Sequence, residues 1–298
     1  MSCCGVCGGN KLEPLFQAVD RNFRTTTDIF VIERCLDCGV AQTAPCPDAD
    51  SVGRYYPPVY YPTEPINRAH VEKKIDRFQK DKMALVRRHC PGGSLLDVGC
   101  GVGHFVREAA LAGYDASGIE LSQEAIAFGR KTWGLPIKQG DLLEVNFPKK
   151  SFDVITLWQV LEHLAHPNES LEEIHKLLRD SGILVIAVPN LSSVQARLFR
   201  GRWYHLDVPR HLFHYDPGSL RKLLANHGFK VLSEHHHDTE HNWAGIMGSV
   251  IPFSPLRRSR AGIAVRRLVG KPVCSLLAAI ESGMGSGGTF TYCAEKIS

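Results

Sequence analysis

The chain has 298 residues, of which 44% are apolar and 22% are charged, and its formal net charge is +4. This composition is typical of a globular protein with a sizeable core, and the small net charge gives no indication of a nucleic-acid-binding protein. No run of eighteen apolar residues suggests a membrane-spanning helix, and the first residues lack the pattern of a signal peptide, so we expect a cytoplasmic protein.

Four of the ten cysteines form two Cys-x-x-Cys-Gly motifs near the start of the chain, Cys4 with Cys7 and Cys35 with Cys38. The spacing lets both thiolates of a motif reach one ion, and the glycine permits the turn that follows. A closed set of four thiolates leaves no open coordination position for chemistry. We therefore predict a zinc ribbon over residues 1–45 with a structural zinc ion, and free or redox-active cysteines are the alternative.

Residues 46–90 are expected to connect this ribbon to the main domain. The prolines of residues 55–65 disfavour a regular element there. Residues 67–89 have helix-forming composition and an apolar stripe. We predict a linker followed by a helix that packs on the main domain.

A glycine-rich turn follows the first apolar strand of the main domain, in residues 94–105. Gly99 and Gly101 let the backbone turn tightly and approach a ligand, and Asp97 places a carboxylate at the strand end. Dinucleotide-binding enzymes use a similar turn, but here His104 replaces the third glycine of their pattern. The sequence therefore favours a different nucleotide-like ligand.

Two further strands end in acidic residues. The strand at 114–120 ends in Glu120, which is placed to accept hydrogen bonds from ribose hydroxyl groups. A third strand ends near Gln139, and the Asp141 that follows can accept a hydrogen bond from the exocyclic amine of an adenine. Ser122 is a good N-cap for the helix after Glu120.

The motifs DVGCGVG, IE, GD, FDVI and LEH together resemble the class I S-adenosylmethionine-dependent methyltransferases over roughly residues 91–235. The resemblance implies an α/β fold, with a Rossmann-like seven-stranded, mostly parallel sheet, helices on both faces and an antiparallel last strand at 289–296. It implies a methyltransferase domain over 91–298, preceded by the small zinc ribbon. It also implies that S-adenosylmethionine is the cofactor, held by Asp97, Gly99, Cys100, Gly101, Glu120, Leu121, Asp141, Leu142 and Gln159.

Two segments should face the methyl group, and a base there would remove the proton of a hydroxyl acceptor. The first, residues 158–164, resembles quinone- and lipid-related O-methyltransferases, some of which use Glu-x-x-Glu-His with a divalent cation. Gln159 stands at the first glutamate, which disfavours a metal site here. Glu162 and His163 can have a direct role in the chemistry, or they can serve only to hold this loop and the start of the next helix in place.

The second segment, residues 203–216, lies in a long connection between a predicted strand at 182–190 and a helix, and long connections are commonly functional. Asp216 is explained as the N-cap of that helix, with Pro217 in its first turn. The histidine tract at 235–237 is interpreted as a polar loop, because neighbouring side chains of an extended chain point to opposite faces. The remaining candidates are His211, then His163 and His205, as base, with Arg210, Tyr204 and Glu162 as substrate-binding residues.

An insertion at 236–288 separates the sixth and seventh predicted strands. Its segment 250–280 combines apolar runs with a basic cluster, namely Arg257, Arg258, Arg260, Arg266, Arg267 and Lys271. A lid, a peripheral membrane contact, a dimer contact and a solvated basic face are all compatible with this pattern.

The predicted function is methyl transfer to a small-molecule acceptor, by O-methylation of a sugar, a lipid-linked glycan, a quinone-like compound or a secondary metabolite. A zinc ribbon before this core also resembles bacterial sugar C-methyltransferases, which makes nucleotide-sugar C-methylation an alternative. An RNA methyltransferase is disfavoured, because the ribbon carries only four basic residues, Lys11, Arg21, Arg24 and Arg34. A non-enzymatic binding module is disfavoured by the intact acidic residues at the strand ends.

Overall fold

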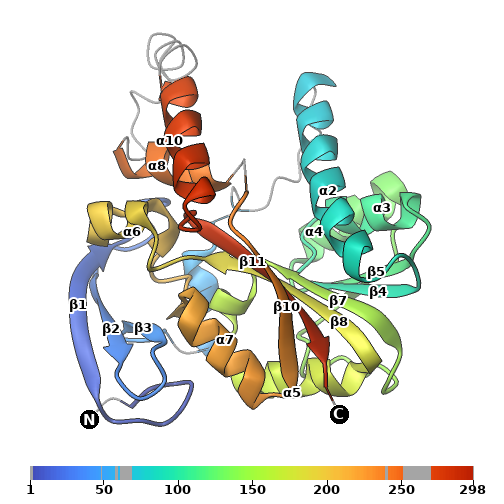
Figure 1. Ribbon diagram of the computed structural model, residues 1–298, viewed down its shortest axis with the longest axis horizontal. Helices are drawn as coiled ribbons and strands as arrows, with labels where there is room; N and C mark the ends of the chain where they lie inside the picture. Colours follow the sequence, from blue (N-terminus) through green and yellow to red (C-terminus); the bar gives the residue numbers. More distant parts are fainter. Residues whose placement is uncertain are drawn as a thin grey trace.

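The computed structural model describes residues 3–47, 49–57, 60, 69–238, 241–250 and 270–297, and Figure 1 shows their arrangement. A small antiparallel sheet opens the chain. Its strands are β1 (Leu12–Val19), β2 (Ile29–Cys35) and β3 (Ala41–Ala44). A fourth strand, β9 (Phe213–His214), comes from the second half of the chain and pairs with β3. The segment 203–216 therefore extends the sheet of the N-terminal ribbon.

The large sheet has seven strands in the order β10-β11-β8-β7-β4-β5-β6. Strands β8, β7, β4, β5 and β6 are parallel, and β11 lies antiparallel between β8 and β10. This confirms the predicted Rossmann-like, mostly parallel sheet with an antiparallel last strand. The bounds are β4 (Ser94–Val98), β5 (Asp115–Glu120), β6 (Ile137–Gln139), β7 (Phe152–Trp158), β8 (Leu178–Pro189), β10 (Phe229–His235) and β11 (Thr289–Lys296).

Helices cover both faces of this sheet, as predicted. One face packs against α2 (Ala69–His89), α3 (His104–Leu111) and α4 (Gln123–Trp133). The other packs against α5 (Pro167–Leu177) and α7 (Pro217–Asn226). Burying an apolar stripe of each helix on the sheet supplies most of the stabilisation of such a fold.

Local capping explains where two of these helices begin. The Ser122 hydroxyl accepts a hydrogen bond from the amide of Ala125 at the start of α4. Asp216 and Ser219 form a reciprocal capping box at the start of α7, with a proline in the first turn. Both predicted N-caps are confirmed.

The ribbon packs directly on the large domain. Cys35, Val40 and Phe213 belong to the same apolar core as Leu171 of α5 and Leu220 of α7. The linker contributes α1 (Ala49–Val52) and a 3-10 helix (Gly53–Tyr55).

Three helices gather at the end of the molecule away from α5 and α7 (Figure 1). They are α6 (Val194–Phe199), α8 (His241–Val250) and α10 (Lys271–Gly283). A buried network joins them, in which Glu281 accepts hydrogen bonds from the backbone and side chain of Gln195. Residues 251–269, which hold five of the six basic residues of the predicted cluster, lie outside the described residues. Among the helices that the structure describes, none is long and apolar enough to cross a membrane.

Candidate active site

The carboxyl ends of β4, β5 and β7 meet at one edge of the sheet, because these strands are parallel and adjacent. Asp97 near the end of β4 is buried, and Thr156 of β7 donates a hydrogen bond to its Oδ1 over 2.6 Å. Burial raises the pKa of Asp97 to about 7, although the Thr156 hydrogen bond and the charge of Lys82 oppose this shift.

The glycine turn after β4 has the backbone that glycine permits. Gly99 and Gly101 have φ values of 66° and 55°. A Cβ atom on Gly99 would lie 2.7 Å from Cγ2 of Val160, whereas one on Gly101 would meet nothing within 4 Å. The backbone at Gly101 therefore faces open space, where a ligand can approach it closely.

Glu120, at the end of β5, holds this turn in place. Its Oε2 accepts a hydrogen bond from the amide of Gly101 at 2.8 Å, and its Oε1 accepts from the amides of Leu121 and Ser122. Leu121 is 63% exposed, an unusual environment for a leucine.

The other predicted cofactor residues lie around the same edge. Asp141 is half-buried and accepts the amide of Leu143, whereas Leu142 is buried. Cys100 packs its sulfur over Gly118, where a Cβ atom would lie only 2.5 Å away. Gln159 has a φ of 59°, and its Nε2 is buried without a hydrogen-bond partner among the described residues.

Lys82 of α2 reaches the same edge and was missed by the sequence analysis. Its Nζ lies 4.6 Å from the ring centroids of both Phe78 and Trp158. Burial lowers its pKa to about 8, while the nearby Asp97 and Asp238 carboxylates act in the opposite direction. A lysine on an amphipathic helix usually faces solvent, so the sequence carried no local signal for this position.

A second cluster lies beyond the end of β7 and consists of Glu162, His163 and His211. The nearest ligand atoms of the three side chains lie within 4.8 Å of one another. The His163 and His211 rings meet edge to face at 4.5 Å between centroids, and His211 Nε2 lies 4.0 Å from Glu162 Oε1. The structure thus brings together a residue from each of the two segments that the sequence singled out.

Neither carboxylate oxygen of Glu162 has a hydrogen-bond partner among the described residues, and the side chain is 1% exposed. Burial raises the pKa of Glu162 to about 8. Burial also lowers the pKa of His163 to about 4 and holds the pKa of His211 well below its usual value. At neutral pH, both imidazoles are uncharged and each keeps a nitrogen lone pair, although burial disfavours their protonated forms.

Backbone carbonyls orient both rings. His163 Nδ1 lies 3.0 Å from the carbonyl of Arg210 and 2.9 Å from the Tyr56 hydroxyl. His211 Nδ1 lies 3.0 Å from the carbonyl of His205. Because a carbonyl can only accept, these contacts favour a proton on each Nδ1 and a free lone pair on each Nε2.

Three other candidates of the 203–216 segment are used in internal contacts. The Arg210 guanidinium is fully buried and donates to Asp20, Asp207 and the carbonyl of Tyr55. His205 places its Nε2 2.9 Å from the carbonyl of His241 in α8. The ring of Tyr204 packs on Gly248 of α8.

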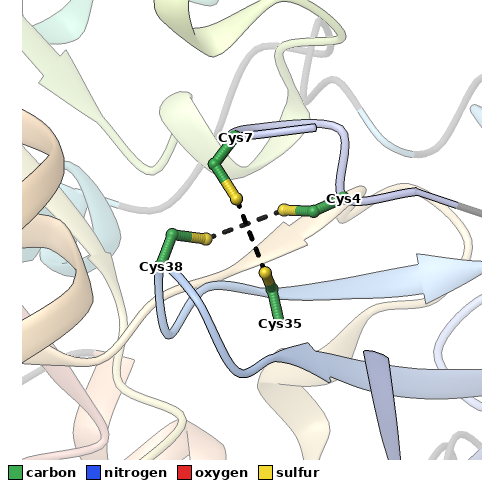
Figure 2. A group of neighbouring side chains, drawn as sticks. All are labelled: Cys4, Cys7, Cys35 and Cys38. Carbon is green, nitrogen blue, oxygen red and sulfur yellow. Dashed lines mark hydrogen bonds between the residues drawn. The ribbon is translucent and has the colours of Figure 1, made fainter. Parts of the chain in front are cut away.

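The four ribbon cysteines point toward one centre (Figure 2). Cys4 and Cys38 bring their sulfurs within 3.6 Å, and Cys7 and Cys35 within 3.5 Å. The amide of Val6 also donates to the sulfur of Cys4. Four converging thiol groups from two knuckles form a donor set that suits a tetrahedral zinc ion.

The family model for a methyltransferase domain matches residues 68–234. A probable S-adenosylmethionine-dependent methyltransferase from Mycolicibacterium smegmatis is 29% identical over 160 residues, which is 52% of this chain and 59% of that protein. The match therefore spans little more than half the length of that relative. A ubiquinone biosynthesis O-methyltransferase from Azoarcus is 28% identical over 181 residues, or 54% of this chain and 75% of that protein.

Among solved structures, the [4+2]-cyclase SpnF superposes with a TM-score of 0.51 at 22% identity and covers 74% of this chain and 80% of its own. This similarity concerns the fold alone, because a [4+2]-cyclase catalyses a reaction other than methyl transfer. The family model covers more than half of the chain. The protein therefore belongs to the methyltransferase domain family.

Proposed function

We propose that the protein transfers a methyl group from S-adenosylmethionine to a hydroxyl group of a small-molecule acceptor. The observation that carries this proposal is the pairing of two sites at one end of the sheet. An open glycine turn bounded by Asp97 and Glu120 adjoins a buried cluster of uncharged imidazoles around Glu162. The first site suits the methyl donor S-adenosylmethionine. The second site can take the proton that the acceptor hydroxyl loses.

The residues of the first site fit the cofactor. Glu120 would accept the ribose hydroxyls, and Asp141 the adenine amine, with the exposed Leu121 and the buried Leu142 against the ring. The backbone of Gly99, Cys100 and Gly101, beside Asp97, would lie along the methionine part. The ammonium of the half-buried Lys82 would bind its carboxylate, and Gln159 offers a buried amide donor that lacks a protein partner among the described residues.

S-adenosylmethionine supplies an already activated methyl group, so the protein must align the acceptor, exclude water and remove one proton. We assign the removal of the acceptor's hydroxyl proton to Nε2 of His211, and His163 is the second candidate for this role. The charge that His211 gains would lower the pKa of the neighbouring Glu162. Loss of the Glu162 proton to solvent would then leave a buried imidazolium–carboxylate pair.

We revise the roles of Arg210 and Tyr204, which were predicted to bind the acceptor, and of His205, which was predicted as a candidate base. Because its donors are already used by carboxylates and a carbonyl, Arg210 would position the segment rather than hold an anionic group. His205 and Tyr204 would fix the same segment to α8. Glu162 keeps its place beside the acceptor.

The ribbon is proposed to hold one structural zinc ion through Cys4, Cys7, Cys35 and Cys38.

The sugar, lipid-linked glycan, quinone-like and secondary-metabolite classes remain the candidate acceptors. The relative named for ubiquinone biosynthesis supports a quinone-like acceptor among them. Nucleotide-sugar C-methylation is the alternative, since it needs a base at the same place.

Calorimetric titration of the full chain with S-adenosylmethionine and S-adenosylhomocysteine tests the cofactor site. Incubation with ¹³C-methyl-labelled donor and a panel of catechols, quinols and nucleotide sugars then tests the acceptor site, and the product's NMR spectrum separates O- from C-methylation. His211→Ala should bind the cofactor normally and lose at least about 100-fold in transfer rate. Full transfer by His211→Ala, or no cofactor binding by the wild type, would overturn the proposal. His237→Ala, at an exposed histidine, is the matched control.

A further inference from the structure

The ribbon touches the acceptor side of the site through two groups of buried polar contacts. In the first, Asp20, directly after β1, forms an ion pair with Arg210. Its Oδ1 lies 2.7 Å from Nη2, and both side chains are 0% exposed. Burial favours the neutral form of Asp20, but the hydrogen bonds and charge of Arg210 outweigh it and lower its pKa to about 2.

Asp207 completes this first group. It accepts hydrogen bonds from Arg210 Nε at 2.9 Å and from the side chain of Asn22 in the ribbon at 2.6 Å. Its carbonyl accepts the amides of Arg210 and His211. The turn that carries His211 is thus closed by its own backbone hydrogen bonds, and its Asp207 and Arg210 side chains tie it to Asn22 and Asp20 of the ribbon.

Thr43 of β3 makes the second group of contacts. Its hydroxyl donates to the carbonyl of His211 at 2.7 Å and lies 3.0 Å from Nε2 of His214, from which it can then accept. Its amide donates to the carbonyl of Leu212, and the amide of Leu212 donates to the carbonyl of Glu162. A short path of hydrogen bonds therefore joins β3 of the ribbon to both members of the His211–Glu162 pair.

The cofactor-side residues lie outside this set of contacts. Asp97 is bonded to Thr156, and Glu120 to the turn at Gly101, both within the large sheet and its loops. Residues of the ribbon make none of the hydrogen bonds described for these two carboxylates. Loosening the ribbon contacts should therefore disturb one side of the active site and spare the other.

We infer that the ribbon forms part of the active site, in which Asp20 and Thr43 are positioning residues that set the His211 imidazole against Glu162. This inference rests on the proposed function for the role of His211. The contacts need the ribbon backbone to be in place, which the thiolate cluster of Figure 2 would secure at the other end of the small sheet.

The test uses the full chain labelled with ¹⁵N-histidine, and long-range proton–nitrogen spectra report the tautomer and pKa of each ring. The sequence has 14 histidines, so a His211→Gln variant assigns the signal. In the wild type, His211 should be neutral, with its proton on Nδ1, across the neutral pH range. In Thr43→Val and in Asp20→Asn, water should reach the loosened segment. The pKa of His211 should then rise by about 1 unit or more.

Three controls make the result specific. Thr43→Ser keeps the hydroxyl and should restore the wild-type signal. Thr26→Val and Asp28→Asn remove an exposed hydroxyl and an exposed carboxylate from the same module, and should leave His211 unchanged. Affinity for S-adenosylhomocysteine should stay within about twofold in all these variants, because sites without shared contacts couple weakly.

Two outcomes would overturn the inference. One is an unchanged His211 tautomer and pKa in both Thr43→Val and Asp20→Asn. The other is a loss of S-adenosylhomocysteine affinity in step with the His211 change, which would show that the ribbon supports the whole fold. Failure of the proposed function is seen separately, as an absence of S-adenosylhomocysteine binding in the wild type. Asp20→Asn keeps the test open if Thr43→Val does not fold.

Discussion

The buried carboxyl of Glu162 makes the stability of the protein depend on pH in a way that one substitution removes. Burial raises its pKa from 4.5 to about 8. Because the folded-state pKa lies above the unfolded one, its favourable contribution is full below pH 4.5 and is lost as the pH rises toward 8. The shift of roughly 3.5 units corresponds to about 5 kcal/mol at most, at about 1.4 kcal/mol per unit.

Glu162→Gln is therefore expected to flatten the pH dependence. Between pH 6 and pH 9, the wild type should lose about 3 kcal/mol of unfolding free energy relative to the variant, measured by urea unfolding at each pH. The comparison of slopes cancels any constant cost of burying the amide. Glu13→Gln, at an exposed position of β1, controls for the loss of one charge.

Parallel curves for the wild type and Glu162→Gln would refute this reasoning. A variant that loses more stability than the wild type at high pH would also refute it. The second result would mean that the carboxylate is ionised in the folded protein and held there by a cation.

Three further predictions concern the cofactor, the ribbon and a helix start. Glu120→Gln should weaken S-adenosylmethionine binding by roughly 10- to 100-fold in calorimetry, because a charged hydrogen-bond acceptor contributes about 1.5–3 kcal/mol; unchanged affinity would exclude Glu120 from the ribose site. Cys38→Ser should lower both the zinc content, measured by mass spectrometry, and the melting temperature, and a zinc-loaded variant of normal stability would contradict a four-thiolate site. Asp216→Ala should cost about 1 kcal/mol of unfolding free energy through loss of the α7 N-cap, with Asp115→Ala as an exposed control, and no cost would show that the cap is dispensable.

Features that depend on neighbouring residues could be predicted from the sequence. The glycine turn, the caps at Ser122 and Asp216 and the continuous apolar runs of the parallel strands are all encoded within a few residues. The seven-stranded, mostly parallel sheet with its antiparallel last strand followed from the family resemblance, and the structure confirms it.

Features that depend on distant partners could not be predicted in the same way. Arg210 looked like an anion-binding side chain because its partner Asp20 lies 190 residues earlier in the sequence. The pairing of β9 with β3 and the place of Lys82 beside Trp158 likewise arise from packing between segments that no local pattern connects. His211 could be placed over the site from the length of its connection, but its approach to Glu162 required the fold.

A structure of the protein with S-adenosylhomocysteine bound would test directly whether the two sites work together. We expect the ligand to lie along the turn from Asp97 to Gly101, with its ribose on Glu120 and its sulfur facing the cluster of Glu162 and His211. A sulfur that faces away from this cluster, or a ligand that leaves Glu120 without a contact, would contradict it.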